Sequence, residues 1–114
     1  MTDYTAAYNI PAIKRGDTMD PFLITIKDKF GVVIIPSNVC CQVRDSRGKL
    51  VITLPTEVDS STGVIKVGGL HAQVTSTIKA GEYNYDVEFT SPEGRVRTYL
   101  EGTFPIIEDV SRCQ

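Results

Sequence analysis

The sequence lacks an excess of charge of either sign, and it lacks any long hydrophobic run. Its 114 residues carry 12 Lys and Arg against 14 Asp and Glu, a net charge of -2, with both signs mixed along the chain. No basic stripe is present to neutralise the phosphates of a nucleic acid. The longest apolar runs, such as residues 32–35, are far shorter than the roughly 20 residues that a membrane helix needs. We therefore expect neither a nucleic acid nor a membrane as a partner.

Cysteine and histidine are also scarce, which limits metal and thiol chemistry. Cys40 and Cys41 are adjacent, so on a strand their side chains face opposite sides, and they lack the short gap that is typical of zinc ligands. His71 is the only histidine. We expect one core thiol, one half-exposed thiol and a free thiol at Cys113, all reduced, with no metal or cofactor. Residues 1–4 show no signal-peptide pattern, so we expect folding in a cytosol.

The clearest pattern that is present predicts a β-strand after Gly81. Large apolar side chains alternate there with polar ones, which places four of them on one side: Tyr83, Tyr85, Val87 and Phe89. Residues 80–85 also have the form of a tyrosine corner, in which a Tyr near the start of a late sandwich strand returns its hydroxyl to nearby backbone. In antibody domains a cysteine occupies the next inward position, where this chain has Tyr85. The pattern indicates an immunoglobulin-like domain without the inter-sheet disulfide.

Short runs of strand residues, separated by turn residues, fill the rest of the chain. The predicted strands are residues 8–14, 22–27, 32–35, 39–44, 49–54, 64–67, 83–90 and 95–107. Pro11 suits an edge strand, and the last strand is expected to be interrupted near Gly102 and Pro105. Residues 55–63 are polar and turn-rich, whereas the apolar spacing in residues 70–78 predicts one or two helical turns. The pattern is typical of an all-β, immunoglobulin-like antiparallel β-sandwich of about seven to eight strands with one short helical turn.

One domain accounts for nearly the whole chain. A chain of this length buries about two thirds of its unfolded surface, which is enough for one core without staples. We predict an N-terminal arm over residues 1–7, the sandwich over residues 8–109 and a C-terminal tail over residues 110–114. The inward-facing residues are expected to form one contiguous core: Phe22, Ile24, Ile26, Val43, Tyr85, Val87 and Phe89.

No candidate site in the sequence carries a specific motif. Residues 15–17 spell the integrin-binding tripeptide Arg-Gly-Asp, but they are also ordinary turn residues, and we assign them no adhesion role. His71 and Asp86 could be combined with a serine, yet no nucleophile elbow is present. Gly68 and Gly69 lack the pattern of a phosphate loop. Five acidic residues fall in or beside turns that they would cap, without the spacing of a calcium loop: Asp17, Asp20, Asp28, Asp45 and Asp59. We predict no catalytic, cofactor-binding or metal-binding residues.

Several short segments, taken in order, resemble small proteins encoded among the tail genes of bacteriophages and prophages. These segments are residues 14–18, 28–31, 42–45, 80–88 and 100–104. In outline the chain is similar to the N-terminal sandwich domain of phage baseplate upper proteins, over about residues 8–109. Those proteins carry further domains that do not appear in this sequence.

The resemblance implies a non-enzymatic structural component of a bacteriophage virion, made and folded in the bacterial host cytoplasm. Such an adaptor of the tail, baseplate or fibre-attachment region would be present in multiple copies and dock other virion proteins. Its first and last strands are the expected sheet edges, to which an arm of a neighbour adds as an extra strand.

Two other function classes remain open from the residues. A carbohydrate or host-receptor binding module is the alternative, because Tyr4, Tyr8 and Tyr99 are candidates for exposure, and an exposed aromatic cluster would favour it. An enzyme would require a pocket that gathers His71 with two carboxylates.

Overall fold

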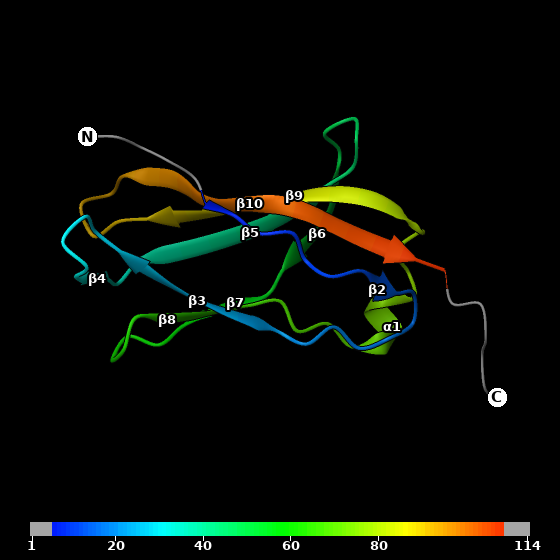
Figure 1. Ribbon diagram of the computed structural model, residues 1–114, viewed down its shortest axis with the longest axis horizontal. Helices are drawn as coiled ribbons and strands as arrows, with labels where there is room; N and C mark the ends of the chain where they lie inside the picture. Colours follow the sequence, from blue (N-terminus) through cyan, green and yellow to red (C-terminus); the bar gives the residue numbers. More distant parts are fainter. Residues whose placement is uncertain (1–5, 109–114) are drawn as a thin grey trace.

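Two layers of strands lie face to face in the computed structural model, which describes residues 6–108 (Figure 1). The first sheet has β1 (Ala6–Ala7) and β2 (Ile13–Lys14) beside β10 (Val96–Ile107), followed by β9 (Gly81–Thr90), β5 (Asn38–Arg44) and β6 (Leu50–Leu54). The second sheet has the order β4 (Val33–Ile34), β3 (Phe22–Lys27), β8 (Val64–Val67) and β7 (Thr56–Val58). The predicted immunoglobulin-like β-sandwich is confirmed.

A single short helix, α1 (Ala72–Thr75), connects β8 to β9 within the described residues. It confirms the helical turn that the apolar spacing predicts, and Leu70 and Ile78 at its two ends are buried. With four residues, it is far too short to cross a membrane, and no other described segment is a helix long and apolar enough to do so.

The chain switches sheets at Pro55, because β6 ends directly before this residue and β7 begins directly after it. The prediction that residues 55–63 form only turns is therefore wrong over residues 56–58. β7 is too short and too polar to show an alternation of its own. It is fixed by pairing with β8, which sets Glu57 opposite Lys66, a favourable pair of charges.

The first ten described residues run parallel to β10 and cover its outer edge. Between β1 and β2 the ladder continues through Tyr8, whose N–H donates to the Glu101 carbonyl at 2.9 Å, and through Ile10, whose N–H donates to the Thr103 carbonyl at 2.9 Å. Pro11 follows at the break, as expected for an edge. Because β1 covers Ala6 and Ala7, the sheet includes two residues of the predicted arm over residues 1–7; residues 1–5 and 109–114 lie outside the described part of the chain.

β10 differs from the prediction in two ways. It is continuous through Gly102 and Pro105, and its register shifts earlier, between Thr98 and Leu100. It also has strands on both sides, so it is not a sheet edge. Gly102 is needed because a Cβ atom there would lie 1.9 Å from the Tyr8 carbonyl oxygen. The first strands therefore pack directly against this glycine.

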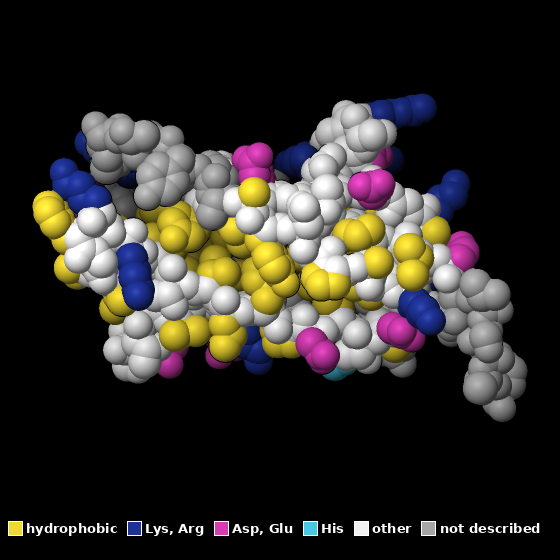
Figure 2. Space-filling view, viewed as in Figure 1, with side chains coloured by type: hydrophobic (Ala, Val, Ile, Leu, Met, Phe, Trp, Pro, Cys, Tyr) yellow, Lys and Arg dark blue, Asp and Glu magenta, His cyan; other side chains and the backbone are white. Residues whose placement is uncertain are grey.

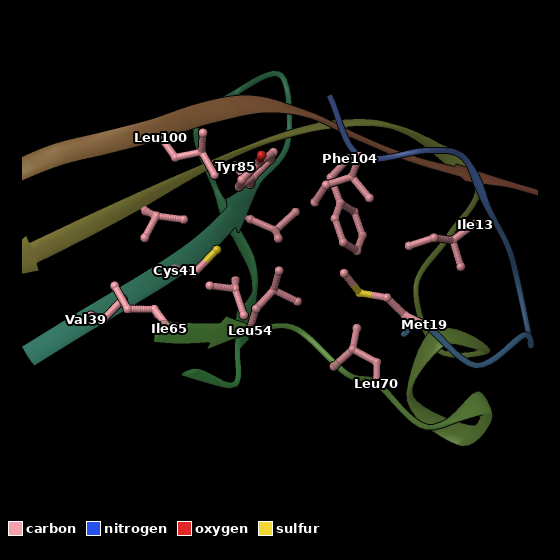
Figure 3. Close-up of a cluster of buried hydrophobic side chains, with 14 of the residues drawn as sticks. Ile13, Met19, Val39, Cys41, Leu54, Ile65, Leu70, Tyr85, Leu100 and Phe104 are labelled. Atoms are coloured by element: carbon pink, nitrogen blue, oxygen red, sulfur yellow. The ribbon is translucent and has the colours of Figure 1, made fainter. Parts of the chain in front are cut away.

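The core lies between the two sheets, and the alternation in β9 has the predicted register (Figure 3). Tyr85 and Val87 are buried, whereas Asn84 and Glu88 are exposed. Two residues of the predicted core set, Phe22 and Ile24, are half-buried and pack against the core. The other five are buried: Ile26, Val43, Tyr85, Val87 and Phe89. Phe104 of β10, which the sequence analysis did not include in the core, is fully buried.

The tyrosine corner is also confirmed. The Tyr83 hydroxyl donates a hydrogen bond to the carbonyl oxygen of Lys79. At the next inward position the Tyr85 hydroxyl donates to the Tyr8 carbonyl at 2.5 Å. A hydrogen bond from β9 thus reaches the first strands of the same sheet.

Candidate docking surface

The Arg-Gly-Asp turn is tied to α1. The Arg15 guanidinium donates from Nε to the Ser76 carbonyl at 3.0 Å. The buried Thr75 hydroxyl donates to the Asp17 carbonyl at 2.6 Å and accepts from the Gly16 N–H at 3.2 Å. Both the backbone of this turn and the Arg15 side chain are hydrogen-bonded to α1 or its C-cap. The turn therefore stabilises the fold and does not project as a free loop.

His71 and Asp86 do not form a catalytic pair. His71 is exposed at the N-terminus of α1. Asp86 lies on the outer face of the first sheet, where its strand neighbours are Gln42 and Glu101. The imagined triad therefore has no geometric basis in the structure.

A hollow of about 340 Å³ does bring His71 near two carboxylates, Asp20 and Glu57. The structure describes no hydrogen bond or ion pair among these three side chains. Thr56 also lines the hollow, but its hydroxyl donates to the Val39 carbonyl at 3.1 Å and is not aligned with His71. Within residues 6–108, no group of three His, Cys, Asp or Glu side chains is placed to hold a metal ion. No described hydrogen bond in this hollow aligns a hydroxyl with His71.

Three of the acidic turn residues cap their own turns, as predicted. The Asp28 carboxylate accepts from the N–H groups of Phe30 and Val32. The Asp45 carboxylate accepts from the N–H of Lys49, which lowers the pKa of this carboxyl, and a bond from Ser61 does the same for Asp59. The remaining two, Asp17 and Asp20, are exposed without such caps.

The adjacent cysteines face opposite sides of β5, as the sequence predicts. Cys41 is buried in the core and Cys40 is half-buried; both are free thiols. Burial is the main cause that raises the pKa of the Cys41 thiol to about 12, and the nearby charge of Asp86 adds to it. Cys113 lies outside the described residues. The raised pKa makes the Cys41 thiol a poor nucleophile.

Gly68 and Gly69 turn the chain after β8. Both have positive φ angles, 91° and 85°, which favour glycine. A Cβ atom on Gly68 would lie 2.8 Å from Cε of Met19, so the chain packs tightly here. These glycines shape the end of the strand.

The aromatic residues do not form an exposed platform in residues 6–108. Tyr8 is exposed and packs against Phe22 with a ring distance of 5.4 Å, near the start of β3. Phe30 is exposed beyond the other end of β3. Tyr99 is half-buried against Phe89, and Tyr4 lies outside the described residues. The two exposed rings are therefore separated by the length of a strand.

One end of the sandwich exposes apolar side chains in the turn after β3, beside β4 and at the start of β10, and we call it the apolar end. Its members are Phe30, Val32, Ile35 and Val96, of which Phe30 is 78% exposed. The Ser37 N–H donates to the Thr90 carbonyl at 2.8 Å, which ties the segment between β4 and β5 to the end of β9. Hydrophobic side chains lie beside Lys and Arg side chains at this end in Figure 2.

The side of the sandwich between β10 and β3 is open. Of the described strands, only β8 pairs with residues 22–25 of β3, while β4 pairs with the last two residues of that strand. Hydrophobic side chains line the middle of this side, between the two layers (Figure 2). This open side and the apolar end both expose hydrophobic side chains.

Comparison with known proteins bears on the fold alone. No family model and no curated protein matches the chain. Among solved structures, CopC from Methylosinus trichosporium OB3b is similar over 96% of this chain and 91% of its own, with 12% identity and a TM-score of 0.48. An internalin-like protein of Listeria monocytogenes is similar over 90% of this chain but only 28% of its own length, with 20% identity and a TM-score of 0.47. Both likenesses are to the fold.

Proposed function

We propose that this chain is a non-enzymatic structural component of a bacteriophage virion, an adaptor of the tail, baseplate or fibre-attachment region. The order of its strand and turn segments supports this proposal through their resemblance to phage tail proteins. The partners are other virion proteins, and the chain acts in multiple copies.

The observation that carries the proposal is the apolar end. Exposed turns and strand ends normally carry polar residues, so apolar side chains gathered there support a contact surface. Phe30, Val32 and Val96 are each more than half exposed and make no contribution to the core. A contact with another protein would remove them from water.

The aromatic residues give the binding-module alternative little support, because Tyr8 and Phe30 lie apart. An enzymatic role has only the hollow at His71 in its favour, and no activated group is found there. Docking is therefore the function that the described surface supports best.

The test is to purify particles from a host that carries the gene and to measure the copy number of the chain by mass spectrometry. We expect the wild-type chain in the particles, and loss of incorporation for the double variant Phe30→Ser, Val32→Ser. The matched control is Leu50→Ser, Ile107→Ser, which removes two exposed apolar side chains elsewhere. Particles that never contain the chain would refute the virion role.

A further inference from the structure

The backbone of β3 has groups on the open side that no described strand binds. The Tyr99 hydroxyl, from the other sheet, reaches the Thr25 carbonyl at 3.5 Å, so this carbonyl points away from β8. In an antiparallel ladder the N–H and C=O of a residue point to the same side, and so do those of the residue two positions away. Leu23 and Thr25 therefore direct their backbone groups toward the open side, where no described strand pairs with them.

A groove leads directly into this edge. It has a volume of about 480 Å³ and lies between residues 8–14 and the segment that enters β3 at Phe22. Most of its lining is apolar: Tyr8, Ile10, Pro11, Met19, Pro21 and Phe22. A chain lying in the groove would therefore reach the edge of β3 in an extended form and bury apolar side chains on the way.

The charges beside the groove select among extended chains. Asp17 and Asp20 are exposed carboxylates on its lining, against one ammonium group, that of Lys14. The excess of negative charge favours a guest with Lys or Arg next to its apolar residues.

We propose that an extended segment of another protein chain, alternating apolar with basic residues, adds as a strand to β3 at Leu23 and Thr25. This inference deepens the docking role proposed above by naming a site and the chemistry of its partner. Main-chain hydrogen bonds supply the affinity of such a strand, and its alternate side chains supply the specificity.

The experiment uses the full chain and a synthetic eight-residue peptide that alternates valine with lysine. Amide hydrogen exchange, followed by NMR, is measured with and without the peptide. We expect exchange at Leu23 and Thr25 to slow by about tenfold or more when the peptide is bound. A peptide that is N-methylated at every residue has no backbone donors for the added strand and should give no protection. A peptide with glutamate in place of lysine should bind about tenfold more weakly.

Two double variants distinguish an effect of the carboxylates beside the groove from an effect of the net charge of the protein. Asp17→Asn with Asp20→Asn should weaken binding of the lysine peptide, whereas Glu88→Gln with Glu93→Gln, exposed elsewhere, should not. Protection at β6 or β7 instead of β3, or slow exchange at Leu23 and Thr25 already without peptide, would overturn the inference. Because these measurements need no virion, a chain that binds the peptide but never enters particles would refute only the virion role.

Discussion

Single hydroxyl groups anchor the corners of this sandwich to its backbone. Tyr83 bonds the segment before β9, Tyr85 bonds the first strands, and Thr75 bonds the turn at Asp17. In each case the donor is a side-chain hydroxyl, and the acceptor is a backbone carbonyl that has no other described hydrogen bond. Removal of the hydroxyl leaves that carbonyl unsatisfied, at a cost that grows with burial.

Replacement of Tyr83 by Phe should therefore lower the free energy of unfolding by about 1 kcal/mol. The matched control is Tyr8→Phe, because the Tyr8 hydroxyl has no described hydrogen bond and its ring packs against Phe22 in either form. Urea denaturation of the three proteins measures the difference. Equal stabilities for Tyr83→Phe and wild type would show that the corner bond does not contribute.

The buried thiol of Cys41 should make stability depend on alkaline pH. Its pKa is about 12 in the folded chain against 9.0 for an ordinary thiol, so the unfolded chain loses the proton first. Stability from this group is complete below pH 9 and falls as the pH rises toward 12. Denaturation midpoints across that window should fall less steeply in Cys41→Ala than in wild type. Parallel curves would show that the thiol does not titrate differently on folding.

At the scale of elements, the pairing of the first strands with β10 requires a residue without a side chain at position 102. Gly102→Ala would place a methyl group against the Tyr8 carbonyl, which belongs to backbone and cannot rotate away. We expect a loss of about 1–3 kcal/mol, with faster hydrogen exchange at Tyr8 and Ile10. Gly81→Ala is the matched control, because it also lies in a strand and would meet only ordinary contacts, at 3.7 Å from Tyr83. Similar losses in both variants would contradict the close approach.

The sequence predicts the strands whose apolar and polar residues alternate. It does not predict strands that form only because they pair with a neighbouring strand. β9 carries a strict alternation, so its register follows from the residues alone. β7 has three residues and forms only by pairing with β8. Gly102 and Pro105 predict breaks when the sequence is considered alone, but the neighbouring strands allow β10 to continue through both. Pro105 lies between Thr103 and Ile107, whose carbonyls both face the first strands, so its missing N–H faces the break between β1 and β2. Proline inside β10 is tolerated for that reason.

The candidate surfaces were less accessible to prediction than the fold. The sequence correctly places the Asp28 and Asp45 caps, because a cap is local. It does not show that Arg15 bonds to Ser76, since that contact spans 61 positions. The open edge of β3 follows from which strands are absent beside it, a property of the whole topology.

At the scale of the molecule, the structure changes the design of the N-terminal truncation. Residues 6 and 7 belong to β1 and pair with Leu100 and Glu101, so the predicted arm over residues 1–7 overlaps the sheet. Deletion of residues 1–7 removes these pairs and should lower the thermal midpoint more than deletion of residues 1–5 does. If either the arm or the tail docks a neighbour, deletion of residues 1–5 or 110–114 reduces the copy number in particles. Folded variants incorporated at the normal copy number would leave the faces and edges of the sandwich as the docking elements.

The parallel pairing of the first strands with β10 has a mechanical consequence. The ladder from Tyr8 to Glu101 and from Arg15 to Ile107 joins two segments that run in the same direction. A tension applied between residue 6 and residue 108 pulls these segments past each other, so the bonds between them are loaded together and in shear. They cannot open one after another, as they would if the strands were antiparallel and peeled from one end. When the domain is pulled along its length, these hydrogen bonds therefore share the load.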